Sequence, residues 1–135
     1  MMGPIAWVRR EQAPRRAHID AWRDACKPGS DGLSPFQVDC ELHLRALMGR
    51  FGLNLAARAI RPMSETGDKY IHGLIGQTQW QLFIYEDGVE VSQSEKTLIR
   101  LEQWDAATPR DLMSRAGEEL EDAIRGGTIS GDRLA

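Results

Sequence analysis

The sequence has few of the residues and patterns that usually reveal a function. It contains two cysteines and three histidines, and its longest apolar runs are far shorter than the roughly 20 residues of a membrane span. It has no Gly-rich phosphate loop, no Gly-x-Ser-x-Gly elbow and no His-Glu-x-x-His motif. We therefore expect a protein that is not an enzyme, needs no cofactor and does not span a membrane.

The length of 135 residues is that of a single domain large enough for a hydrophobic core. Hydrophobic residues make up 41% and charged residues 27%, which are ordinary values for a globular protein. The first residues place their positive charge after a short apolar stretch, the reverse of a secretory signal. The two cysteines have no disulfide spacing pattern, so reduced thiols and a cytoplasmic location are expected.

Three segments have the periodicity of helices. Before the first, residues 1–12 lack periodicity and are expected to form an arm. The first helix follows Pro14, with a stripe of Ile19, Trp22 and Cys26. The second begins with a capping box at residues 34–37, and its apolar stripe consists of Phe36, Cys40, Leu44, Leu47, Met48 and Phe51.

The last helix begins at Thr108, ends at Gly126 and Gly127, and has the stripe Leu112, Ala116, Leu120 and Ile124. Residues 128–135 are expected to be a loose tail. Between the second and third helices, alternation and turn residues predict strands at about 53–60, 69–75, 79–85, 89–92 and 97–104. The turn at Glu86, Asp87 and Gly88 favours a hairpin, because an Asp-Gly pair suits positive φ angles. The fold class is therefore α+β: two N-terminal helices, a mainly antiparallel meander sheet of four or five strands, and one C-terminal helix.

The central strands are apolar on both faces. Trp80, Leu82 and Ile84 point to one side, and Phe83 and Tyr85 point to the other. A sheet with a solvated face should be polar there. Either the three helices cover both faces, or they lie on one side and leave the other face for a partner protein or a second copy of the chain.

The charge is uneven along the chain. Residues 1–61 contain ten Lys and Arg against six Asp and Glu, whereas residues 62–135 contain seven against fourteen. Acidic side chains gather in the last helix and at the hairpin, where they could steer a basic protein partner while aromatic side chains anchor it. The candidate partner-binding residues are Glu118, Glu121, Asp122, Glu86, Asp87, Glu90, Phe83 and Tyr85.

Two alternative kinds of site remain open. The basic N-terminal region could contact nucleic acid phosphates through Arg9, Arg10, Arg15 and Arg16. The sequence pI near 5.6 argues against a dedicated nucleic-acid-binding protein. Cys40 and His43, three residues apart on one helix, could both reach a zinc ion, but Cys40 also belongs to the apolar stripe and no full ligand set accompanies it. We expect no metal site.

As an analogy of size, charge and fold class, this small acidic α+β chain without a catalytic set is similar to bacterial immunity proteins, antitoxins and phage-encoded inhibitors. Such proteins commonly act by occluding a partner. The sequence therefore favours a non-enzymatic cytosolic module that neutralises or regulates another protein, with an accessory subunit that contacts nucleic acid as the alternative. A homodimer is compatible with either hypothesis, the protein-binding module or the accessory subunit.

Overall fold

The computed structural model describes residues 15–63 and 65–130. It confirms the predicted α+β class, with an antiparallel five-stranded sheet in the order β1-β2-β3-β4-β5. Its elements are helical residues 15–23, α2 (Pro35–Arg50), β1 (Leu55–Pro62), β2 (Lys69–Ile75), β3 (Gln81–Tyr85), β4 (Gly88–Gln93), β5 (Lys96–Glu102), the short 3₁₀ helix η1 (Gln103–Asp105) and α3 (Pro109–Arg125). In the described part of the chain, no helix is long and apolar enough to cross a bilayer.

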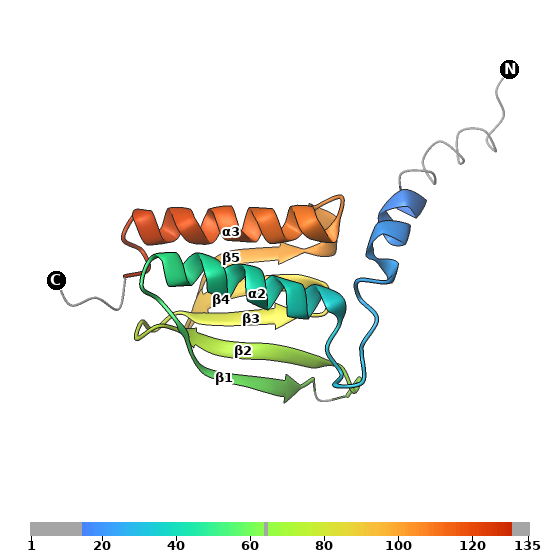
Figure 1. Cartoon of the computed structure of the whole chain (residues 1–135), viewed down its shortest axis with the longest axis horizontal. Coiled ribbons are helices and arrows are strands. Elements are labelled where there is room, and N and C mark those ends of the chain that lie inside the picture. Colours follow the sequence, from blue (N-terminus) through green and yellow to red (C-terminus); the bar gives the residue numbers. More distant parts are fainter. Residues whose placement is uncertain (1–14, 64, 131–135) are drawn as a thin grey trace, which may run out of the picture.

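Helices α2 and α3 lie side by side on one face of the sheet (Figure 1). The hydrophobic core is the layer between the two helices and the sheet, because alternate strand residues point toward the helices. The stripes of both helices face the same layer, as their spacing predicts, except that Phe51 and Ile124 at the ends of these stripes are only half-buried. Large core side chains that are almost completely buried include Phe36, Leu44, Met48, Ile71, Ile75, Leu82, Ile84, Leu112 and Leu120.

The capping box predicted at the start of α2 is present and also joins the helix to the sheet. The Ser34 hydroxyl accepts from the Gln37 backbone N–H, and the Gln37 side-chain oxygen accepts from the Ser34 N–H at 2.8 Å. The Gln37 amide nitrogen then donates to the carbonyl oxygens of Lys69 at 2.7 Å and Ile84 at 3.1 Å. One buried glutamine thus satisfies backbone groups of three separate elements.

The hairpin between β3 and β4 occurs at the predicted turn, but Gly88 has a different role from the one expected. Its φ angle is not positive, unlike that of Gly67 in the β1–β2 connection, which is +78°. Gly88 is instead the first residue of β4, and a Cβ atom there would lie 2.7 Å from the carbonyl oxygen of Leu101. Close approach of β5, rather than turn geometry, requires glycine at this position.

The first helix buries a different face from the predicted one. Ile19 is 46% exposed, whereas Trp22 is buried against Phe36 with ring centroids 5.3 Å apart. His18, one turn before Trp22, bonds through Nε2 to the carbonyl oxygens of Gln103 at 2.6 Å and Ala106 at 3.1 Å. The expected stripe of Ile19, Trp22 and Cys26 is therefore wrong at Ile19, because the helix packs against η1 through His18.

The chain after α3 is held more firmly than the sequence indicates. Ile129 is fully buried and its N–H donates to the Ala123 carbonyl at 3.1 Å. The carbonyl of Thr128 accepts from the Trp80 indole N–H, also at 3.1 Å. The predicted loose tail thus does not begin at residue 128, because one isolated apolar residue fills a core position. Residues 131–135 and the predicted arm at 1–12 lie outside the described residues.

Candidate protein interface on the open face of the sheet

Four aromatic rings form a continuous row on the sheet face opposite the helices. Tyr70 and His72 come from β2, and Phe83 and Tyr85 come from β3. His72 pairs with Phe83 in the strand register, and their rings stack with centroids 4.8 Å apart. The Tyr70 and Tyr85 centroids are 5.6 Å apart, and those of Phe83 and Tyr85 are 6.2 Å apart. These distances are typical of favourable aromatic contacts.

The described residues adopt the second of the two arrangements that the sequence left open. Both α2 and α3 lie on the face that carries Ile71, Leu82 and Ile84, so the aromatic row receives no cover from them (Figure 1). The four rings are half-buried and lie against one another. Among the described residues, no helix packs on this face. We call this surface, with Tyr70, His72, Phe83 and Tyr85 at its centre, the open face.

A hollow of about 350 Å³ lies beside the hairpin that joins β3 and β4. Tyr85 pairs with Gly88, and Gly88 pairs with Glu102, so a residue without a side chain separates two large ones. Trp104 of η1 and Met63, which directly follows β1, also border the hollow. Its lining consists of Met63, Asp68, Tyr85, Glu86, Asp87, Gly88, Val89, Glu90, Arg100, Leu101, Glu102 and Trp104.

The hollow has a strong excess of negative charge. Its lining contains five carboxylates and a single guanidinium, that of Arg100. Arg100 pairs with Glu90 in the register of β4 and β5, and its Nη2 lies 3.7 Å from the Glu102 carboxylate. Asp87 accepts a bond of 3.0 Å from the Gln103 amide. Among the described residues, the carboxylates of Asp68, Glu86 and Glu90 have no ion-pair partner within 4.0 Å.

Two groups in the hollow respond to this environment. Partial burial, followed by the negative charges of Asp68 and Asp87, raises the pKa of the Glu86 carboxyl. Partial burial also raises the pKa of Tyr85, with Glu90 the next largest cause, while Arg100 acts in the opposite direction. Both changes have the same cause: charge in this hollow is negative and incompletely solvated.

The acidic residues predicted in the last helix lie on a different surface. Helix α3 packs on the core side of the sheet, so Glu118 and Asp122 are exposed on the far side of the domain from Phe83 and Tyr85. The eight candidate partner-binding residues therefore belong to two surfaces. One flat interface cannot include both.

Glu121 is the least available of the three helical acids. Its carboxylate lies 3.6 Å from Arg50 Nη2 on α2 and 3.5 Å from Arg125 Nε on α3. A shallow groove of about 230 Å³ between the two helices is lined by His43, Leu47, Arg50, Ser114, Gly117, Glu118 and Glu121. The negative charge of Glu121 is thus partly neutralised within the domain, and the helical surface is less acidic than its sequence indicates.

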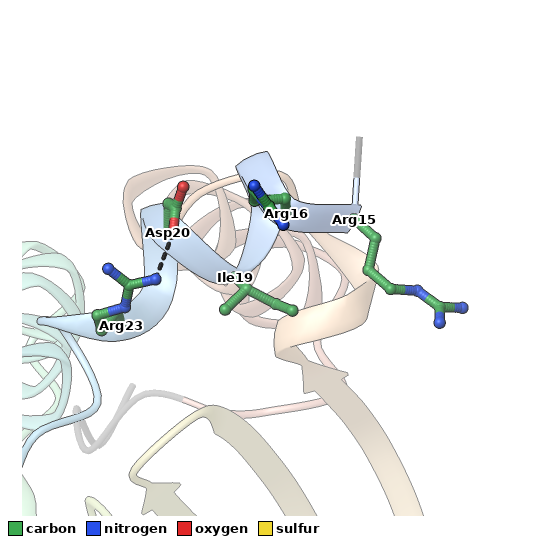
Figure 2. A pocket seen from close by; sticks show the side chains of 5 residues that line it. All are labelled: Arg15, Arg16, Ile19, Asp20 and Arg23. Atoms are coloured by element: carbon green, nitrogen blue, oxygen red, sulfur yellow. Dashed lines mark hydrogen bonds and ion pairs between the residues drawn. The ribbon is translucent and has the colours of Figure 1, made fainter. Parts of the chain in front are cut away.

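The basic N-terminal residues of the alternative hypothesis are only partly described. Arg9 and Arg10 lie outside the described residues, while Arg15 and Arg16 are exposed. Figure 2 shows Arg15 extended away from the other labelled side chains, and Arg23 paired with Asp20 at 2.5 Å. The depression that these residues border is lined by one helical segment alone. Among the described arginines there, the structure brings no group together into a phosphate clamp.

Cys40 and His43 do not converge on a common point. Cys40 is fully buried in the core, whereas His43 is exposed and borders the groove with Gly117 of α3. The alternative that both could reach one zinc ion is not supported, because Cys40 points from α2 into the core and His43 points toward solvent. In the described part of the chain, no three His, Cys, Asp or Glu residues are grouped as a metal would require.

Several residues of the open face and of the hollow were not among the predicted candidates. Tyr70 and His72 could have been included, since strand alternation places them beside Phe83 and Tyr85 once the register is known. Trp104 was predicted to end a strand but lies in η1, where it is 61% exposed. Gly88 gave no local signal of its role. Its importance arises from contact with β5, thirteen residues later.

No protein-family model matches the chain, and no curated protein or solved structure shows significant similarity to it.

Proposed function

We propose that this protein is a non-enzymatic binding module that neutralises or regulates a partner protein, and that it binds this partner through the open face. The observation that supports the proposal most directly is the aromatic row of Tyr70, His72, Phe83 and Tyr85 on a sheet face that no described helix covers. Aromatic side chains of this kind are enriched at protein interfaces relative to the rest of a protein surface.

The chemistry of the surface favours a basic protein as the partner. Tyrosine and phenylalanine are rigid and supply large contact areas, so they commonly dominate binding free energy. The carboxylates at the hairpin end would accelerate the encounter with positive charge and give the interface its orientation. An aromatic centre beside a charged end is the usual arrangement of a protein interface. The finer assignments, an immunity protein, antitoxin or inhibitor acting in the cytosol, are part of this proposal.

Nucleic acid is the less favoured partner. The aromatic rings could stack on bases, but the five carboxylates at one end of the sheet would repel a phosphate backbone. The exposed Arg15 and Arg16 belong to a separate element, and Arg23 is already paired with Asp20. These charges favour a protein partner, and nucleic acid recovered in the crosslinking experiment below would contradict that choice.

The proposal can be tested by site-specific photocrosslinking in the native host. A benzoylphenylalanine replaces Phe83 on the open face, Leu42 on the exposed side of α2, or Glu118 on α3. We expect a specific crosslinked protein from position 83 and none from position 42. The crosslinked protein is then produced recombinantly, and its affinity for the unmodified chain is measured by calorimetry.

Paired variants decide which surface binds. Phe83→Ala should weaken the complex by about 2 kcal/mol or more if this ring is an anchor. The matched control, Glu118→Lys with Asp122→Lys on α3, should leave the affinity nearly unchanged. Loss of binding in the control with retention in Phe83→Ala would reject the open face. Crosslinks to RNA or DNA, or to a second copy of this chain, would contradict the proposal that the partner is a different, basic protein.

A further inference from the structure

We infer that the hollow beside Gly88 receives the guanidinium or ammonium group of an Arg or Lys side chain from the basic partner. This inference rests on the proposed function and specifies what one part of the interface recognises. The hollow is continuous with the open face through Tyr85, which belongs to both. A partner side chain inserted there would place its neighbouring residues over the aromatic row.

The shape of the hollow follows from the strand register. Gly88 lies between Tyr85 of β3 and Glu102 of β5, so the floor is backbone and the two flanking side chains form walls. A side chain cannot be added to the floor without displacing the Leu101 carbonyl, which lies 2.7 Å from a Cβ at position 88. The strand register and the close approach of Leu101 therefore keep this space free of a side chain from position 88. Its volume of about 350 Å³ can accommodate a long side chain.

The charges of the hollow select a cation. The Glu86 and Asp68 carboxyls have no hydrogen-bond or ion-pair partner among the described residues, in contrast to Asp87, which accepts from Gln103. The single internal cation, Arg100, lies on the β5 side next to Glu102. A second guanidinium would meet unpaired carboxylates on the opposite wall. A carboxylate or phosphate would be repelled by the excess of carboxylates in the lining.

The aromatic side chains add a second preference for positive charge. Tyr85 forms one wall, and the Trp104 indole stands at the rim with 61% of its surface exposed. One face of this indole is covered by His18, whose ring centroid is 4.3 Å away. A cation within about 6 Å of such ring faces is attracted by the aromatic quadrupole. Carboxylates and aromatic faces thus favour the same ligand charge.

The inference can be tested before the partner is known. Hexa-arginine and hexa-lysine peptides are titrated into the full chain by calorimetry, with hexa-glutamate as a negative control. Three isosteric changes, Glu86→Gln, Glu90→Gln and Glu102→Gln, remove charge from the hollow without removing volume. The matched control combines Glu118→Gln, Glu119→Gln and Asp122→Asn on α3, which changes the net charge by the same amount.

We expect the hollow variant to bind hexa-arginine at least about tenfold more weakly and the α3 variant to differ from the parent by less than about twofold. The Trp104 indole N–H resonance should shift on titration in the parent chain and stay in place in the hollow variant. Equal losses in both variants, or no binding by the parent, would overturn the inference. Spermidine that binds as tightly as the peptide would assign the hollow to a free polyamine instead.

The partner identified by crosslinking separates this inference from the proposed function. If Phe83→Ala loses the partner while the hollow variant retains it, the open face is the interface and the hollow is not its cation site. If both variants retain the partner, the proposed function itself fails. If both lose it while the α3 variant does not, both statements hold.

Discussion

The imidazole of His18 lies flat against the indole of Trp104, with ring centroids 4.3 Å apart and an angle of 12° between the planes. His18 Nε2 also contacts the carbonyl oxygens of Gln103 and Ala106. One side chain therefore fixes the N-terminal helix to η1 and supports the residue at the rim of the hollow. This contact joins residues that are more than eighty positions apart in the chain.

Replacing His18 tests this contact. His18→Ala should destabilise the fold by about 1–3 kcal/mol, because it leaves partly buried carbonyl groups without their donor. Ile19→Ala, at the 46% exposed neighbour, should cost less than about 0.5 kcal/mol. Urea denaturation measures both. A greater loss of stability in Ile19→Ala than in His18→Ala would mean that Ile19 is buried, as the sequence pattern predicts.

The core stripe of α2 provides a second prediction. Leu44→Ala should lower the free energy of unfolding by about 2–5 kcal/mol, since Leu44 is only 1% exposed in the core. Leu42→Ala on the same helix makes the same chemical change at a side chain that is 62% exposed and should cost little. Equal denaturation midpoints for the two variants would contradict the burial of this stripe.

Two glycines should respond in opposite directions to alanine. Gly88→Ala should destabilise the fold by about 1–3 kcal/mol, because the new methyl group meets the Leu101 carbonyl. Gly49→Ala adds a methyl group with no atom within 4 Å in helix α2 and should stabilise by about 0.5–1 kcal/mol. Thermal melts distinguish the two. A stable Gly88→Ala variant would mean that β5 is not held so close to β4.

The bridging amide of Gln37 gives a fourth prediction. Gln37→Ala should cost about 1–3 kcal/mol or more, because the Lys69 and Ile84 carbonyls and the Ser34 N–H lose their partner together. Gln93→Ala, which removes only an exposed bond to Gln79, is the control and should be nearly neutral. Amide hydrogen exchange at the start of α2 should accelerate in Gln37→Ala and remain unchanged in the control.

The two free thiols should differ in reactivity. Burial, reinforced by Asp39 and Glu41, raises the pKa of Cys40 to about 12, and burial followed by Asp87 and Glu86 raises that of Cys26 to about 11. Because the thiolate is the reactive form, both should be alkylated slowly at pH 8, with Cys40 modified only on unfolding. The variant Cys26→Ser isolates the reaction of Cys40. Rapid labelling of Cys40 in the folded variant would contradict its burial.

The same pKa changes predict how stability depends on alkaline pH. The unfolded thiols lose their protons near pH 9, whereas the folded thiols keep them to about 11 and 12. Unfolding therefore releases protons above pH 9, and stability should decline as pH rises through this range. Replacement of both cysteines by alanine should reduce that decline. An unchanged pH dependence would assign it to other groups.

Much of the secondary structure follows from short stretches of sequence. The capping box at Ser34, the cap at Thr108 and the glycine at position 67 act within a few residues, so their effects can be read without tertiary information. The aromatic and acidic residues near the hairpin were likewise visible as candidates. The burial of Ile129 and the exposure of Ile19 were not, because each depends on which distant surface the segment meets.

The sequence by itself determined the helices, the strands and the α+β class, because periodicity, caps and turns are properties of neighbouring residues. Only the tertiary structure decided that both long helices share one sheet face and leave Phe83 and Tyr85 on the other. It also paired Glu121 with Arg50 and brought Gly88 against Leu101. These contacts depend on the packing of elements far apart in the chain, for which local residue patterns contain no distance information.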